Sequence, residues 1–436
     1  MKRTTVNFLC CLVLTPALSL EAIAAEGGAG HEALPADEAS LVRYALQHNP
    51  ELQAARWSSA TADAGVVSAA ALANPVLHAE WLHAEAPGDY GLGIGVEWSP
   101  PAPGVYGPHQ DAARADARAV HADLEERAAD LEAGVRIAYA EARASVEQLE
   151  LLDRSVDTRR ALREATQARV QRGAANRIDL NLASIGLARG EQARERSALN
   201  ANASLARLER LIGLGPGQRL ELPAPEAVSA VAESSLQSRA TNELADRQLV
   251  QQALAARPLL RADRERQVAA EQALRAGRAK RWPWIELMAR YRRHDQSNYP
   301  NDVTLGATLS IPLPGHESGP IAALESDLER AHVLANAHRN ELERDIRSLA
   351  DEHARYAQIS AHYSETVAPV LSEHAALVKA ALAGLELDLT ALFTAEDMVT
   401  QGGLEYVQAR LATRQAEIAL ERSLGRYGRG EPGARP

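Results

Sequence analysis

Apolar and polar residues alternate along four short segments of the chain, two between residues 74 and 108 and two between 282 and 320. A period of two is the pattern of a β-strand with one apolar face. The residues between the apolar positions are mostly polar or small, so each pair of segments predicts a β-hairpin. The apolar positions are Leu77, Ala79 and Trp81, then Leu92, Ile94, Val96 and Trp98, then Ile285, Leu287, Ala289 and Tyr291, and last Val303, Leu305, Ala307, Leu309 and Ile311.

The two hairpins belong to an internal repeat. Pro75 and Pro283 precede them at a spacing of 208 residues, and Pro50 and Pro258 have the same spacing. Beyond the hairpins the spacing grows to 212 residues, as between Pro108 and Pro320. Self-similarity of this kind indicates two copies of one structural unit. We expect a signal peptide at 1–24, repeats at 25–213 and 243–424, a linker at 214–242 and a disordered tail at 425–436.

The remainder of the first repeat follows helical patterns. A helix over 36–72 is expected to start near Asp37 and to be interrupted at Pro50, with Asn49 as the cap of its second part. A much longer helix runs from Pro108 to about residue 172, and at 1.5 Å per residue it is about 95 Å long. Apolar or small residues recur along it at alternate steps of four and three, which is a heptad seam. The seam comprises Leu124, Ala128, Leu131, Val135, Ala138, Ala142, Ser145, Leu149, Leu152 and Val156.

Glycines mark the far ends of the long helices. Gly173 ends the first one as a C-cap residue, and Asp179 is expected to cap a return helix that reaches about residue 212. In the second repeat, a turn from Gly384 to Leu389 follows the long helix, and Thr390 is the expected cap of the last one. Both helix-turn-helix tips are therefore expected at the end opposite the hairpins.

The second repeat has the same order of elements as the first. A helix over 243–280 leads into its hairpin, a long helix begins at Pro320, and a final helix reaches about residue 424. Pro369 lies within this long helix and is expected to kink it, because proline lacks the backbone N–H.

The composition indicates close helix packing and export from the cytoplasm. The chain of 436 residues is 46% hydrophobic but only 4% aromatic, and alanine supplies much of the difference. Lys2 and Arg3, an apolar run from Val6 to Leu20, and the small-residue site Ala22-Ile23-Ala24 together predict a cleaved signal peptide. Both cysteines lie inside it, so the mature chain is expected to contain no disulfide.

Charge and motif content exclude several classes of function. The net charge is −11 and no basic block occurs, which argues against nucleic-acid binding. No later segment has the length and apolarity of a transmembrane helix. No phosphate-binding loop, zinc-protease motif or nucleophile elbow is present, so neither an enzyme nor a resident cofactor is expected.

The alternating strands point to a membrane. Each is about ten residues long, which is the length of a tilted transmembrane strand. Strands can span lipid only within a closed barrel, and four strands cannot close one, so the barrel must be shared between chains. Residues near the strand ends such as Trp81, Trp98, Trp284 and Tyr291 would form an aromatic girdle. The alternative is a half-buried sheet in a soluble periplasmic protein.

In its order of motifs the chain resembles the TolC family of outer-membrane efflux proteins. The resemblance rests on Ala45 to Pro50, on Asn74-Pro75, and on the proline-glycine segments that follow each hairpin, Pro101 to Gly104 and Pro312 to Gly315. It also rests on the two turn patterns that begin at Gly173 and Gly384.

This resemblance implies a mainly α-helical homotrimer with a small β part. A twelve-stranded barrel, four strands from each chain, would lie in the outer membrane and continue into an α-helical tunnel in the periplasm. The implied partners are a periplasmic adaptor protein, an inner-membrane pump and outer-membrane lipid. The side chains expected to face lipid are Leu77, Trp81, Leu92, Ile94, Trp98, Ile285, Leu287, Leu305 and Leu309.

Within the family the layout is most similar to the CzcC-like group, which serves heavy-metal resistance-nodulation-division pumps. The chain has 13 histidines, including His78, His83 and His294 near the strands, but none of them has a recognisable ligand spacing. We interpret them as scattered surface residues and expect no metal site.

In other members of the family, aspartates of the second tip ring the aperture at the position of Thr390 and three residues further on. Here these positions hold Thr390 and Phe393, so the resemblance does not carry over an acidic ring. Asp388, Glu396 and Asp397 are near enough to supply negative charge. Phe393 could either pack between the tip helices or narrow the pore as an apolar gate.

The sequence therefore favours a passive duct that carries substrates, heavy-metal cations among them, from a pump and adaptor to the exterior. Two alternatives stay open: a soluble periplasmic coiled-coil scaffold or adaptor, and the same channel fold serving type I protein secretion. The residues expected to form the tip and its aperture are Gly173, Asp179, Gly384, Asp388, Thr390, Phe393 and Asp397.

Overall fold

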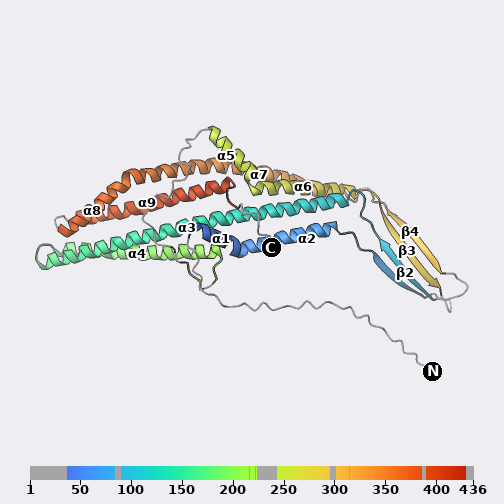
Figure 1. Cartoon of the computed structure of the whole chain (residues 1–436), viewed down its shortest axis with the longest axis horizontal. Helices are drawn as coiled ribbons and strands as arrows, with labels where there is room; N and C mark the ends of the chain where they lie inside the picture. The colour runs from blue at the N-terminus through green and yellow to red at the C-terminus, as the bar shows by residue number, and fades with distance from the viewer. Residues whose placement is uncertain are drawn as a thin grey trace, which may run out of the picture. The chain divides into compact units, whose positions relative to one another are not determined.

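A computed structural model gives the fold of the chain. It describes residues 37–83, 90–215, 217–220, 222, 243–294, 301–313, 315–384 and 389–428. The expected signal peptide and most of the expected linker lie outside these residues. The predicted fold class is confirmed, since long helices accompany one small four-stranded sheet (Figure 1).

The first repeat contains four helices: α1 (Glu38–His48), α2 (Pro50–Ala70), α3 (Tyr106–Gln171) and α4 (Arg177–Ile212). Asp37 caps α1, because its carboxylate accepts a hydrogen bond from the backbone N–H of Ser40. Asn49 caps α2 in the same way, and Pro50 is its first residue. These starts are the ones that the sequence predicts, because side-chain acceptors satisfy the free N–H groups of a first turn.

The second repeat contains α5 (Glu243–Ala256), α6 (Pro258–Ala279), α7 (Ser318–His362), α8 (Ala368–Gly384) and α9 (Leu389–Ser423). Between α7 and α8 lies one π-helical turn, Tyr363–Val367. It comes directly before the dipeptide Ala368-Pro369, so the interruption predicted from Pro369 takes the form of a wider helical turn. A proline cannot donate to the preceding turn, and the π-turn accommodates this loss.

The four strands form one antiparallel sheet in chain order: β1 (Val76–His83), β2 (Tyr90–Trp98), β3 (Trp284–His294) and β4 (Asp302–Ser310). Both predicted hairpins are present, and β2 pairs with β3, so the sheet joins the two repeats. The strands lie together where α2 and α6 end and where α3 and α7 begin (Figure 1). Within the described part of the chain, the outer edges of β1 and β4 have no partner strand.

Helix α3 is the central element of the helical part. It packs against α4, α6, α2, α9 and α1. Half of the predicted seam is buried, namely Val135, Ala138, Ala142, Leu152 and Val156, and the other half is only partly covered. One seam was too simple a prediction, because α3 has neighbours on several sides. Buried alanines line these other sides, and their small size lets the helices approach closely.

In each repeat, the end of the return helix lies against the start of the helix that leads to the sheet: α4 meets α2 in the first repeat, and α9 meets α6 in the second. Gly213 ends α4 with a left-handed backbone, φ 79°, and a Cβ atom there would lie 2.9 Å from the carbonyl oxygen of His48. The Asn49 side chain completes this junction by donating to the carbonyl of Leu211 at 2.9 Å. In the second repeat Gly425 lies against Ala256 in the same manner.

The expected disordered tail is partly wrong. Residues 425–428 fold back onto α3, where the backbone N–H of Gly428 donates to the Glu132 carboxylate at 3.0 Å. Tyr427 is only 6% exposed, and the guanidinium of Arg136 lies 5.0 Å from its ring centre. An aromatic side chain that is buried against a cation holds this segment in place. Residues 429–436 lie outside the described part.

Candidate functional site

The sheet has one continuous apolar face. Directly paired residues point to the same side, and the register pairs Leu77 with Val96, Ile94 with Tyr291, and Leu287 with Ala307. The apolar face is exposed: Leu305 is 78% exposed, Trp81 72% and Ile94 47%. The positions predicted to face lipid that lie on this face are Leu77, Trp81, Leu92, Ile94, Trp98, Ile285, Leu287, Leu305 and Leu309.

The opposite face of the sheet is polar and carries both signs of charge. His78 on β1 contacts Glu97 on β2 at 3.0 Å, and Glu80 on β1 reaches Arg290 on β3 at 3.3 Å. The second contact crosses β2 at Gly93 and Gly95, which leave room for the long side chains of Glu80 and Arg290. The glycines thus permit an ion pair between strands that are not neighbours.

Trp98 connects the sheet to the helical part. Its indole N–H donates to the carbonyl of Ala73, 2.9 Å away, in the segment between α2 and β1. The indole thus combines an apolar ring on the exposed face with a polar N–H that is hydrogen-bonded. The aromatic girdle stays a prediction.

The first tip differs from the prediction at its cap. Gly173 adopts φ 76° after the end of α3, as expected. The N-cap of α4, however, is Asn176 and not Asp179. Asp179 lies three residues further on and completes a capping box, because its carboxylate accepts from the N–H of Asn176 at 3.1 Å. Both residues satisfy free donors of the first turn, so the sequence pattern fits either position.

The second tip also begins earlier than predicted. Helix α9 already includes Leu389 and Thr390, so Thr390 lies inside the helix and is not its cap. Because α4 and α9 begin 212 residues apart, the counterpart of Asn176 is Asp388. Asp388 lies outside the described residues. Gly384 is the last residue of α8, in agreement with its expected place at a helix end.

Phe393 lies between helices of the two repeats. Its ring is so close to Gly186 of α4 that a Cβ atom there would be 2.8 Å from Cε1. Beside it, Leu162 of α3 and Leu392 are both buried. This contact agrees with the packing interpretation of Phe393. A role in narrowing a pore stays a prediction.

A buried charge cluster beside Phe393 escaped the sequence analysis. Arg159 of α3, 11% exposed, pairs with Glu396 at 2.7 Å and also with Asp397. The same guanidinium donates to the carbonyl of Gly186 at 3.1 Å, and Ser155 donates to Glu396. Arg159 thus ties α3 and α4 to α9. Nothing in the local sequence distinguishes it from the many other arginines of the long helices.

A second charge cluster lies where α5 meets α6. Glu126 of α3 accepts from the N–H of Leu259 at 3.2 Å and pairs with Arg257 and Arg422 at 2.9 and 2.6 Å. It therefore caps α6 from another helix, in place of the asparagine that caps α2. Burial by itself raises the pKa of Glu126, but the hydrogen bond from Arg422 and the positive charge of Arg257 outweigh it, so the pKa is lowered.

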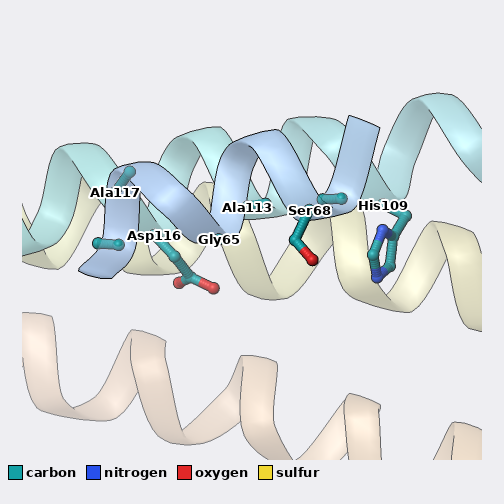
Figure 2. Close-up of a pocket in the computed structure, with 8 residues that line it drawn as sticks. Gly65, Ser68, His109, Ala113, Asp116 and Ala117 are labelled. Atoms are coloured by element: carbon teal, nitrogen blue, oxygen red, sulfur yellow. The ribbon is translucent and has the colours of Figure 1, made fainter. Parts of the chain in front are cut away.

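A pocket of about 410 Å³ lies between α2 and α3. Figure 2 shows Ser68 on α2 and His109 and Asp116 on α3 among its lining residues. Burial raises the pKa of the Asp116 carboxyl, and the charge of Arg266 opposes that shift. The rest of the lining is small: Ala62, Gly65, Ala69, Ala113 and Ala117. A pocket with so few polar groups offers little to fix a ligand.

Two searches of the described residues bear on other functions. No group of three or more His, Cys, Asp and Glu side chains there could hold a metal ion. None of the helices described has an apolar run that could cross a membrane.

Comparison with solved structures identifies the fold. No protein-family model matches the sequence, and no curated protein matches it significantly. The transmembrane channel CusC superposes with a TM-score of 0.74 at 16% identity, over 92% of this chain and 95% of CusC. The outer-membrane channel CmeC of Campylobacter jejuni gives 0.72 at 14% identity, over 89% of this chain and 85% of CmeC. The open-state outer-membrane channel MtrE of Neisseria gonorrhoeae gives 0.70 at 17% identity, over 89% of each chain.

These similarities extend over nearly the whole of each chain, so they cover the sheet and the long helices together. At such identities they establish the fold, and the chain has the fold of outer-membrane channel proteins.

Proposed function

We propose that this chain is the outer-membrane channel of a tripartite efflux system and a member of the TolC family. The observation that carries the proposal is the exposed apolar face of a sheet with two open edges, attached to a helical part with the fold of outer-membrane channels. Such a face is costly in water, and open edges are intolerable in lipid. A barrel completed by further copies removes both problems at once.

The size of that barrel follows from the sheet. Three copies of four strands give twelve strands, an even number within the range of outer-membrane barrels. The apolar face then meets outer-membrane lipid, and the polar face with His78, Glu80 and Arg290 lines the water-filled interior. The helices extend into the periplasm, where their tips meet an adaptor protein and an inner-membrane pump. In this role the chain is a passive duct and catalyses no reaction.

Heavy-metal cations are the substrate class to test first, because of the resemblance to the CzcC-like group. The polar face supports passage of hydrated ions in general, since it carries paired charges of both signs. A duct needs no tight binding site, because conduction requires that ions leave as readily as they enter.

Fractionation and conductance test the proposal together. The mature protein should stay with outer membranes through a carbonate wash and be released by detergent, and the purified trimer should conduct ions in planar bilayers. A wash that removes the protein would support the soluble scaffold instead. A strain that lacks the gene should accumulate the metal salts that its pump exports, and the gene in trans should restore tolerance.

A further inference from the structure

Inside one chain the two repeats pack against each other, and this interface can be used as a template to predict how neighbouring copies of the chain would pack. Strand β2 pairs with β3, helix α3 follows β2, and α6 precedes β3. Helices α3 and α6 pack against each other, so the strand pairing continues as helix packing. Three arginine–carboxylate pairs join the two helices: Arg118 with Glu265, Asp123 with Arg266, and Glu125 with Arg261. A fourth pair joins Glu126 to Arg257, the residue just before α6.

At the open edges of the sheet, β4 is followed by α7 and β1 is preceded by α2, but neither edge strand has a partner strand within the described part of the chain. By the repeat, β4 corresponds to β2 and β1 corresponds to β3. Where β4 of one copy pairs with β1 of the next, α7 of the first copy must lie beside α2 of the second. This step rests on the shared barrel of the proposed function, and the interface between α3 and α6 then gives the residues that meet.

The register of the repeat is fixed by geometry. Helices α2 and α6 both begin at a proline, 208 residues apart. From β2 to β4 the apolar face is kept at a spacing of 211, since Ile94 corresponds to Leu305. The same spacing relates Gly104 and Gly315, which both have positive φ, 80° and 91°.

The first residues of α3 and α7 are 212 apart, but the buried residues Val135 and Ile346 are 211 apart, so burial within the two helices follows the spacing of 211. Ala115, Ala119, Ala122 and Glu126 are buried on the side of α3 that faces α6, at helical steps of four, three and four. At a spacing of 211, their counterparts on α7 are Ser326, Arg330, Val333 and Ala337, and all four are exposed. The surface that α3 uses inside the chain is therefore free on α7.

The corresponding positions hold no arginine–carboxylate pair, and two of them, Trp57 and Leu334, are apolar. The pair Arg118–Glu265 corresponds to Glu329 and Trp57, and Asp123–Arg266 corresponds to Leu334 and Ser58. Trp57 is 76% exposed, Val333 58% and Leu334 47%. The register puts Trp57 opposite Glu329, one helical turn before Val333, and puts Leu334 opposite Ser58, the residue next to Trp57, so the three apolar side chains become neighbours. The third pair, Glu125–Arg261, corresponds to Asn336 and Gln53, whose amides can bond to each other.

We propose that α2 of one subunit packs on α7 of the next in this register, with Trp57 seated on Val333 and Leu334 of the neighbouring copy. The occupant is a second copy of this chain. A large exposed aromatic opposite two exposed aliphatic residues is the composition of an interface core. In this register, the arginine–carboxylate pairs between the repeats are replaced between chains by an apolar contact around Trp57 and an amide pair of Gln53 and Asn336.

Cysteine cross-linking tests the proposed interface between α2 and α7, since the chain after the expected signal peptide contains no cysteine. We expect Ser58→Cys combined with Leu334→Cys to give linked dimers and trimers with a short bis-maleimide, and either single variant to give none. The control pairs Ser58→Cys with Arg339→Cys, which is exposed on another side of α7 and should not link. All of these side chains lie at the surface, so the fold tolerates the changes.

A second measurement examines Trp57 itself. Trp57→Ala should lower the temperature at which the oligomer dissociates in detergent, and Val67→Ala should leave it unchanged. Val67 is equally exposed on α2, at 72%, but its counterpart Arg275 is exposed and lies outside the template interface.

The outcomes separate this proposal from the proposed function. An oligomer that conducts ions but fails to link at Ser58 and Leu334, or links equally in the control pair, overturns the proposed interface between α2 and α7. The proposed channel function would then still stand. A chain that stays monomeric in detergent and in membranes overturns both.

Discussion

At the scale of single residues, the removal of Arg159 is expected to lower the stability of the protein strongly. Its removal leaves Glu396, whose side chain is 7% exposed, without a counter-charge. We expect Arg159→Met to destabilise the protein by about 3–5 kcal/mol, as is typical when one partner of a buried ion pair is lost. Thermal unfolding followed by circular dichroism measures the effect.

Arg160 provides the matched control for Arg159. It is 50% exposed and pairs with Asp157 within the same helix. Arg160→Met should change stability by less than about 1 kcal/mol, as for other exposed ion pairs. Equal losses in the two variants would mean that the cluster around Glu396 does not hold the tip helices together.

Phe393 provides a second test at the tips. Phe393→Ala removes the ring that packs on Gly186 and should cost about 2 kcal/mol, below the range for a fully buried phenylalanine because the side chain is only partly covered. Single-channel conductance in bilayers should stay unchanged. A rise in conductance at unchanged stability would instead show that the ring narrows the pore.

The pKa of Glu126 gives a dependence on pH. A carboxyl whose pKa is lowered by folding stabilises the native state above its unfolded pKa, and this contribution is lost as pH falls through the folded value. Glu126→Gln should therefore be less stable than the parent protein at pH 7. The gap should narrow below the ordinary value of 4.5. Melting temperatures of the two proteins across this range measure the gap, and a constant gap would contradict the assignment.

At the scale of elements, the two faces of the sheet should respond differently to substitution. Ile94→Arg or Leu305→Arg places a charge on the apolar face and should block stable insertion of the trimer, because an arginine at the bilayer centre costs about 2–4 kcal/mol in each copy. Gly93→Ser and Thr304→Ser on the polar face should be mild. At Gly93 a new Cβ would lie 3.6 Å from the Cβ of Glu80, an ordinary contact.

Insertion is measured as the heat-stable trimer recovered from outer membranes. The serine variants control for any change of side chain within a strand. Equal tolerance of arginine on both faces would contradict the assignment of the apolar face to lipid.

The two repeats also differ at the scale of elements, and the differences explain local features. The spacing is 208 residues between the starts of α2 and α6, and 212 both between the starts of α3 and α7 and between those of α4 and α9. In α7, Leu324 packs against Gly277, whereas its counterpart Ala113 leaves the pocket beside Ala69 open.

At the scale of the whole molecule, the contact between the two repeats of one chain has the same form as the contact expected between neighbouring chains of the trimer. The same strand pairing and helix packing occur once inside the chain, between β2–α3 and β3–α6. In the proposed trimer they would occur again between chains. A variant that disturbs the proposed interface between α2 and α7 should therefore also weaken the pairing of β1 with β4 between chains.

The sequence alone determined the elements and their order. Alternation located all four strands, Pro50 located the start of α2, and the repeat predicted that the second half would match the first. The helix predicted over 243–280 is wrong in one respect, because the structure divides it into α5 and α6 at Pro258. These signals are local, because period, caps and proline act within a few residues of the backbone. The apolar face of the sheet could be assigned in advance for the same reason.

Only the tertiary structure decided which distant side chains meet. Arg159 with Glu396, Glu126 with Arg257, and Phe393 with Gly186 are separated by more than a hundred residues in sequence. No local pattern distinguishes such residues, because their roles arise from helices that converge in space. The caps at the tips were also misplaced from sequence, since Asn176 and Asp179 both suit an N-cap and only the backbone decides between them. Local sequence signals therefore determined the helices and strands of this protein, and tertiary contacts between distant residues determined how those elements pack.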